Sequence, residues 1–196
     1  MKKKMLAMVF AVMMVCGTAG CGGNAETQAE NSAATETQNQ ETMATEMQTE
    51  LQSYDVLLDA EAAAAAGMYT IANGAVVSGQ DKWDAFMAGE TDSVILCQFT
   101  IKGGAMLDYV KQQEDGSYLV VSDLTRDGYE YAEKEDYKTQ TFTEIKVFEN
   151  FVAQEGGKPH TVCVMTDDST LDADTFLTYW EELSYEENGA FILFVI

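Results

Sequence analysis

Hydrophobic residues recur along the chain with two periods, and the change from one period to the other marks the expected elements. Residues 55–67 and 78–89 carry apolar side chains at helical spacing, with Asp55 and Ser78 as N-caps and a glycine at each C-terminal end. A third helix with an apolar face is expected after the acidic, cap-rich segment 167–174.

Elsewhere the apolar positions follow the two-residue period of β-strands. Asn73-Gly74 separates two short apolar runs and is the strongest two-residue hairpin signal. The runs VILCQFTI, AMLDYVKQQ and YLVVSDL are joined by short glycine-containing turns and predict an antiparallel meander. The runs KTQTFTEIKVFENF, HTVCVMT and AFILFVI follow as further strands, and the last is so apolar that it must be covered on both faces or lie centrally. The sequence therefore predicts an α+β fold, with two or three helices packed on a mainly antiparallel sheet.

The N-terminus has the order of a secretory signal. Lysines at positions 2–4 precede an apolar run over 5–15 that is too short for a comfortable membrane span. Three small residues then lead to Cys21, and this order resembles the signal of bacterial lipoproteins, in which the cysteine becomes the lipid-modified first residue. The resemblance implies that residues 1–20 are removed and that acylated Cys21 anchors the protein in the lipid bilayer, at the extracytoplasmic face of the cell membrane. The alternative is a plain secretory peptide cut near Ala19.

A low-complexity segment follows the signal. Residues 22–52 are mostly Glu, Gln, Thr, Ala and Asn, with no Lys, Arg, Pro or aromatic residue. Such a composition buries too little apolar surface to offset the entropy of ordering, so residues 21–52 are expected to be a disordered tether. Transient helix is compatible with this composition, and residues 43–51 could extend a following helix. Residues 53–196 remain as one acidic domain, long enough to bury a core.

Charge narrows the range of partners. The chain has 33 acidic against 11 basic residues and a formal net charge of −22. Binding of nucleic acid needs clusters of Lys and Arg, and the folded part contains no such cluster. The sequence therefore excludes a nucleic-acid partner and leaves an unknown protein or small-molecule ligand.

The domain has two cysteines and one histidine. Cys97 and Cys163 both lie in apolar, strand-like runs, where an extracytoplasmic address permits a disulfide but two buried free thiols are equally ordinary. This question stays open on the sequence. His160 is three residues from Cys163 and faces the other side of a strand, so a zinc site is not expected. His160 follows a proline at a strand start and is interpreted as a surface residue.

The segment SDLTRDGYEYAEKEDY contains the strongest candidate site. Asp123, Thr125 and Asp127 are oxygen-bearing residues at alternate positions, as in a calcium loop. The twelfth position of such a loop, which needs a bidentate acid, is Lys134, and a strand precedes the loop where an EF-hand has a helix. Arg126, the only arginine of the chain, lies between the ligands and can instead bridge Asp123 and Asp127 as a structural hub.

The same residues carry a second resemblance. An apolar strand ending in Phe99-Thr100-x-x-Gly103, a hairpin, and then Asp123-x-Thr125-Arg126-Asp127 is similar to a family of small Gram-positive lipoproteins of unknown function. The resemblance spans roughly Gly79 to Tyr129. It implies the fold and the cellular address, but no activity.

No set of catalytic residues is recognisable in the sequence. There is no phosphate-binding glycine loop or G-x-S-x-G elbow, and the single histidine leaves little room for a triad. Asp108 stands between apolar neighbours in a strand, and the default expectation is that it points outward; facing inward would raise its pKa. The leading hypothesis is a non-enzymatic binding module without cofactor or metal. The alternatives are a cation-modulated (calcium) module and, last, a carboxylate-based hydrolase acting on wall glycans.

Overall fold

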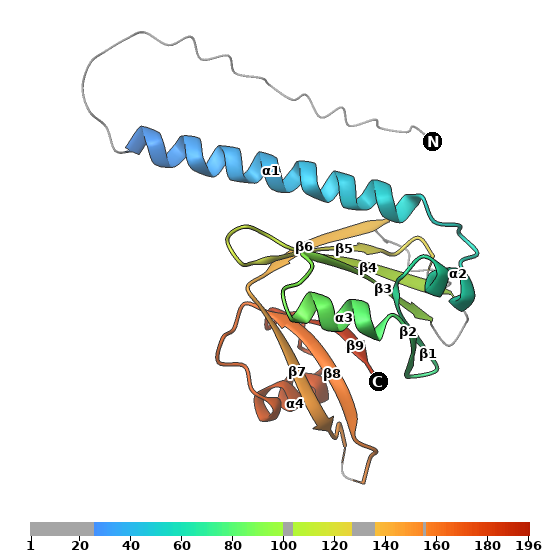
Figure 1. Ribbon diagram of the computed structural model, residues 1–196. Helices are drawn as coiled ribbons and strands as arrows, with labels where there is room; N and C mark the ends of the chain where they lie inside the picture. Colours follow the sequence, from blue (N-terminus) through green and yellow to red (C-terminus); the bar gives the residue numbers. More distant parts are fainter. Residues whose placement is uncertain (1–25, 100–103, 127–135, 155) are drawn as a thin grey trace, which may run out of the picture. The chain divides into compact units, whose positions relative to one another are not determined.

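The computed structural model describes residues 26–99, 104–126, 136–154 and 156–196, with side chains from residue 37 onward (Figure 1). The chain divides into two units, Met1–Glu36 and Thr37–Ile196, and the described strands all lie in the second unit. The predicted α+β class is confirmed.

The elements of the described residues follow one another in a mixed order. The helices are α1 (Glu26–Gln52), α2 (Ala60–Ala65), α3 (Gln80–Met87) and α4 (Ala173–Glu182). The strands are β1 (Tyr69–Ala72), β2 (Ala75–Ser78), β3 (Ser93–Phe99), β4 (Ala105–Gln112), β5 (Tyr118–Asp123), β6 (Tyr137–Phe142), β7 (Glu144–Phe151), β8 (His160–Thr166) and β9 (Ala190–Val195).

The strands form two sheets, where the sequence predicted one. The first has six strands in the order β2-β1-β3-β4-β5-β6, antiparallel except for the β1–β3 pair, and it contains the predicted β3-β4-β5 meander. The second has three antiparallel strands in the order β7-β8-β9. The chain changes sheet at Thr143, whose N–H donates to the Asp167 carboxylate at 2.9 Å. The polar–apolar alternation continues through this point. Because alternation shows which face a residue is on but not which strand lies next to it, the sequence did not reveal the change of sheet.

One core lies between the two sheets. Trp83 and Phe86 of α3 join it, and the Trp83 ring stacks on Tyr69 with 5.4 Å between centroids. Phe194 of β9 meets the Trp83 ring edge-on at 5.2 Å. Because Trp83 is enclosed by other rings, it is a packing residue, as the sequence predicted. The three-stranded sheet and α3 thus cover the same face of the six-stranded sheet (Figure 1).

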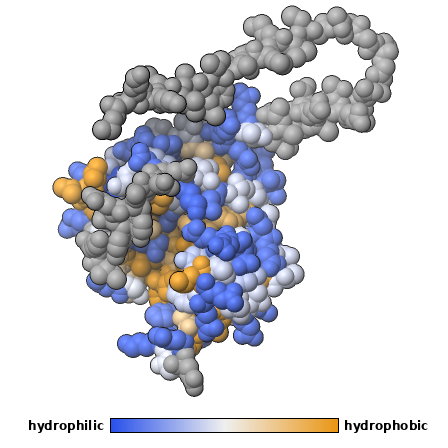
Figure 2. All heavy atoms as spheres, turned by 180° about the vertical axis from the view of Figure 1, so that it is seen from behind, coloured by the Kyte–Doolittle hydropathy of each residue, from blue (hydrophilic) through white to orange (hydrophobic). Residues whose placement is uncertain are grey.

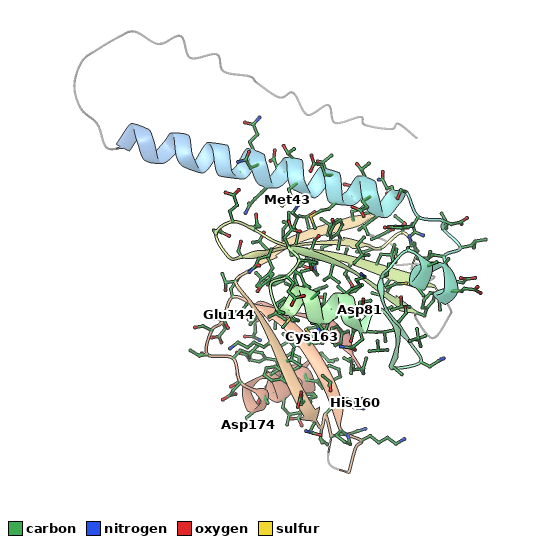
Figure 3. All side chains as sticks on the ribbon, viewed as in Figure 1. Met43, Asp81, Glu144, His160, Cys163 and Asp174 are labelled. Carbon is green, nitrogen blue, oxygen red and sulfur yellow. The ribbon has the colours of Figure 1, made fainter. Side chains whose placement is uncertain are left out.

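The opposite face of the six-stranded sheet is covered by the C-terminal part of α1. Met47 is 3% exposed and Leu51 is fully buried, and both pack against apolar residues of β4 and β5 such as Leu107 and Leu119. Met43, labelled in Figure 3, packs against the edge of the same core. These apolar residues recur every four positions and therefore lie along one side of the helix.

This packing changes the expected domain boundary. The sequence predicted a disordered tether up to residue 52, whereas α1 is helical over Glu26–Gln52 and the folded unit begins at Thr37. The composition of the segment is that of a spacer. Composition alone, however, does not show how the few apolar residues are spaced along the segment. That spacing is sufficient to dock the helix on a sheet that itself needs a cover.

The third core lies under α4. Phe176 of α4 is fully buried, and it stacks on Phe148 of β7 with 5.4 Å between ring centroids. Strand β9 contributes Ile192 to this core and Leu193 to the core between the sheets. Of the two arrangements predicted for AFILFVI, coverage on both faces is therefore confirmed, whereas a central position is not, because β9 is the end strand of its sheet.

The helix starts differ from the predicted ones. Helix α2 begins after Asp59, whose carboxylate accepts the N–H of Ala62 at 2.8 Å, whereas Asp55 forms a turn with the N–H of Leu57. Ser78 ends β2 and does not cap α3. Both predicted caps were acceptable residue types, but Asp55 closes a local turn and Ser78 pairs with Thr70 as part of β2.

Glycine and asparagine residues permit the tight connections around β1. The predicted hairpin turn at Asn73-Gly74 is confirmed, with φ of 54° and 71° at the two positions. Gly79 caps α3 with a φ of 74°, and a Cβ atom there would lie 2.2 Å from the carbonyl oxygen of Met68. Only glycine satisfies both conditions.

The surface of the folded unit is mixed. Figure 2 shows hydrophilic residues over much of one face, with apolar residues exposed between them in smaller patches. The most exposed large apolar side chains of the described residues are Leu57 at 87% and Leu183 at 79%. Isolated apolar side chains of this kind are normal on a folded domain.

Candidate functional site: an arginine clamp and the adjacent cavity

Asp123, at the end of β5, organises the first part of the site. Its side chain is fully buried, and its Oδ1 atom accepts the N–H of Thr125 at 2.9 Å and the hydroxyl of Thr125 at 2.6 Å. The other oxygen, Oδ2, accepts Nε–H of Arg126 at 2.7 Å. The carboxylate therefore closes the turn after β5 and holds the guanidinium group in one orientation.

The remaining donors of Arg126 reach a different part of the chain. Nη2 donates to the carbonyl oxygens of Leu51 at 3.1 Å and Tyr54 at 2.8 Å, and Nη1 donates to the carbonyl oxygen of Asp55. These carbonyls lie at and just after the C-terminal end of α1, and those of Leu51 and Asp55 also accept the N–H groups of Tyr54 and Leu58. Arg126 thus acts as the C-terminal cap of α1, and its positive charge lies at the negative end of the helix dipole.

We call Asp123, Thr125 and Arg126, with the carbonyl groups of residues 51, 54 and 55, the arginine clamp. The structure brings together three of the four residues that the sequence assigned to a hub, and Asp127 lies outside the described residues. Sequence reasoning did not find the carbonyl partners. Main-chain acceptors leave no signal in residue types, and these are more than 70 positions away.

The clamp geometry bears on the calcium alternative. Both oxygens of Asp123 are engaged, one by Thr125 and the other by a guanidinium group. Within residues 26–99, 104–126, 136–154 and 156–196, no group of three or more His, Cys, Asp or Glu residues is arranged to hold a metal ion. Lys134, the twelfth residue of the expected loop, is outside the described part, and the calcium hypothesis stays a prediction.

A cavity of about 170 Å³ opens beside the clamp. One wall is the end of α1, and the others are the segment after α2, the first turn of α3, and strands β3 and β4. The lining residues are Glu50, Tyr54, Ala66, Gly67, Met68, Lys82, Ser93, Val94, Ile95 and Tyr109. The ends of α1 and α3, the strands β3 and β4, and the segment between α2 and β1 therefore meet at one small concave site.

The polar groups of the cavity converge on Glu50. The Tyr54 hydroxyl donates to Glu50 Oε1 at 3.5 Å, and the Tyr109 hydroxyl interacts with Ser93 and Glu50. Burial raises the pKa of Tyr54, and the negative charge of Glu50 raises it further. Burial also raises the pKa of Tyr109, which Ser93 lowers and Glu50 raises again. Both tyrosines are therefore neutral hydrogen-bonding groups at physiological pH.

The clamp positions one wall of this cavity. Arg126 binds the carbonyls of residues 51, 54 and 55, and the neighbouring residues Glu50 and Tyr54 carry the side chains that line the wall. A shift of the α1 end would displace the carboxylate and one of the two hydroxyl groups together. The sequence could not identify Glu50 or Tyr54, because Glu50 lies within, and Tyr54 just after, a segment whose composition is that of a spacer.

Asp108 points inward, and the expectation that it points outward is wrong. It is 4% exposed and accepts the Ser122 hydroxyl at 2.5 Å. Burial raises its pKa to about 6, against hydrogen bonds from Ser122 and Gln98 that lower it. Its neighbours in β4, Leu107 and Tyr109, face α1, so Asp108 faces the space between the sheets. Asp108 is not among the residues that line the cavity.

The two cysteines of the domain are free thiols in the two cores that lie on opposite sides of the six-stranded sheet. Cys97 belongs to the core under α1 and Cys163 to the core between the sheets, where Figure 3 labels it. The question of a disulfide is thereby answered. Burial raises the pKa of the Cys97 thiol to about 12 and raises that of Cys163 as well, so neither is a reactive thiolate. His160 is exposed at the start of β8, as predicted.

Comparisons with known proteins give no relative for this chain: no family model, no curated protein and no solved structure matches it.

The clamp yields a stability prediction. Arg126→Ala leaves the buried Asp123 carboxylate without a cation and removes the donors from the end of α1. We expect the free energy of unfolding to fall by about 3–5 kcal/mol, measured by urea denaturation of the full chain in detergent. Lys138→Ala is the matched control, since Lys138 pairs with Glu186 at 3.7 Å on the surface and should cost less than about 1 kcal/mol. Equal losses in the two variants would contradict the clamp.

Asp108 yields a pH prediction. Its pKa is raised from 3.8 to about 6 in the fold, so the folded state keeps a proton that the unfolded chain has already released. Stability therefore falls as the pH rises from about 4 to about 6 and then levels off, by about 3 kcal/mol for this group. Asp108→Asn should remove this pH-dependent contribution to stability. The free energies of unfolding of the variant and of the original protein, measured by urea denaturation at a series of pH values, should therefore differ by an amount that changes with pH. Parallel curves for the variant and the original protein would refute the assignment.

Proposed function

We propose that this protein is a lipoprotein anchored to the extracytoplasmic face of the cell membrane, and that its folded unit is a non-enzymatic binding module. The anchor rests on the signal-like order of residues 1–20 before Cys21, which lies outside the described residues. No helix of the described residues is long and apolar enough to cross a membrane. The resemblance to small lipoproteins over Gly79 to Tyr129 supports the same address.

The observation that carries the binding role is the clamped cavity. Charge-assisted hydrogen bonds from Arg126 fix the backbone of this wall, so the main chain that carries Glu50 and Tyr54 is held in place before any ligand arrives. A site prepared in this way loses little conformational entropy on binding. The anchor and the cavity together suit a module that captures a ligand outside the cytoplasmic membrane.

The chemistry of the lining also favours binding over catalysis. Its hydroxyl groups belong to Tyr54 and Tyr109, whose raised pKa values keep them protonated, and to Ser93. A hydroxyl group becomes a nucleophile only when a base activates it. These groups are therefore suited to donate and accept hydrogen bonds to a ligand.

The anchor is tested by detergent-phase partition of the full chain expressed in a bacterium that processes lipoproteins. The protein should enter the detergent phase, and Cys21→Ser should move it to the aqueous phase because the acylated residue is lost. Cys16→Ser is the matched control, since Cys16 lies in the segment removed with the signal, and it should partition like the original. Unchanged partition of Cys21→Ser would contradict the lipid anchor.

The binding module is tested by a fragment screen on the full chain in detergent micelles, with ¹³C-labelled methionine methyl groups as the probe. Met68 lines the cavity, and Met165 lies in the core between the sheets and serves as the internal control. At least one small molecule from a set of cationic, neutral and anionic fragments should shift the Met68 signal and leave Met165 unchanged. A screen in which no fragment of any charge shifts Met68 would contradict a ligand site here.

A further inference from the structure

The lining of the cavity has one carboxylate, that of Glu50, and one ammonium group, that of Lys82. The Glu50 carboxylate lies 3.5 Å from the Tyr54 hydroxyl, whereas the Lys82 ammonium group lies 3.6 Å from the exposed carboxylate of Asp81, which does not line the cavity. Burial raises the pKa of Tyr54, and the charge of Glu50 raises it further. A cation beside Tyr54 is therefore attracted by the Glu50 carboxylate, and an anion at the same place is repelled by it.

The hydrogen-bonding groups also match a cation. The Glu50 carboxylate only accepts hydrogen bonds, and the hydroxyls of Tyr54, Tyr109 and Ser93 have lone pairs that can accept them as well. An ammonium group has three donors and no acceptor, so this lining can complement it.

We infer that the cavity binds the ammonium group of a small amine or of a lysine side chain, with Glu50 as its counter-ion. This inference rests on the proposed binding function and specifies the class of ligand for the same cavity. A volume of about 170 Å³ admits an ammonium group with a short aliphatic stem and leaves a larger remainder outside.

Lys82 allows a test of whether the ligand of the cavity is positively or negatively charged. It lines the cavity from α3, and its ammonium group lies 3.6 Å from the exposed carboxylate of Asp81. A positive ligand in the cavity is repelled by Lys82, whereas a negative ligand would use it as a partner. Removing the charge of Lys82 therefore strengthens the binding of a cation and weakens the binding of an anion.

The experiment is calorimetric titration of the full chain in detergent micelles with three probes of similar size: n-butylammonium, n-butanol and butyrate. Butylammonium should bind, and butanol and butyrate should not bind measurably under the same conditions. Glu50→Gln should weaken butylammonium binding by about tenfold or more, the usual effect of losing a charge-assisted hydrogen bond. Lys82→Gln should strengthen it about two- to fivefold, as expected for a partly screened charge.

Thr49→Ala is the matched control on α1. The Thr49 hydroxyl donates to the carbonyl oxygen of Thr45 at 2.8 Å and does not line the cavity, so butylammonium affinity should be unchanged. Butyrate or butanol binding as tightly as butylammonium would overturn the inference, as would weaker butylammonium binding in Lys82→Gln. Thermal melting of Glu50→Gln identifies any loss that comes from unfolding, because Glu50 is exposed and its substitution should leave the melting temperature unchanged.

Two further measurements are needed. One distinguishes a free amine from a lysine side chain as the ligand, and the other tests the ammonium inference separately from the binding module. The first probe is a lysine peptide flanked by glycines. If it binds more tightly than butylammonium and loses binding when the lysine is acetylated, the ligand is a protein partner. If it binds equally or more weakly, the ligand is a free amine. A fragment screen in which only neutral or anionic molecules shift Met68 overturns the ammonium inference and leaves the binding module standing. A screen with no shift at all overturns both.

Discussion

The contact on which the rest of this structure depends is the buried guanidinium group of Arg126. It joins a carboxylate at the end of β5 to three main-chain carbonyls at and just after the end of α1, so that one cation bonds two segments that are more than 70 residues apart. A buried charge is costly unless it is fully paired, and here the paired arrangement also orients the helix. The docking of Leu51 on the sheet and the position of the cavity wall both follow from it.

Coverage of the six-stranded sheet is the second constraint. Its central strands are apolar on both faces, so each face needs a partner layer. The C-terminal part of α1 covers one face, and α3 with the three-stranded sheet covers the other. Gln98 connects the layers, since its Nε2 donates to the carbonyl oxygen of Leu193 at 2.6 Å. Asp108 and Ser122, which both belong to the six-stranded sheet, form a hydrogen-bonded pair on the face toward the second sheet. This pair is a directional interaction within a core whose other contacts are mostly apolar.

Much of the local structure was predictable because short-range signals carried it. The Asn73-Gly74 turn, the meander of β3 to β5 and the double coverage of AFILFVI all follow from turn chemistry and from the period of apolar residues. Neighbouring strands on either side of Thr143 were assigned to one sheet, since a continuous alternation does not show where a chain changes partner. The start of α2 was misplaced because Asp55 and Asp59 are equally good caps on residue type alone.

The sequence by itself determined the α+β class, the acidic charge, the buried character of most strands and the prominence of Arg126 beside Asp123. It also gave the order of residues that predicts a lipid-anchored protein. Only the tertiary structure decided that α1 belongs to the folded unit, that Asp108 faces inward, and that Glu50, Tyr54 and Tyr109 meet at one cavity. The reason is physical: each of these depends on what packs against a residue from a distant part of the chain. A residue's own chemistry and its close neighbours do not contain that information.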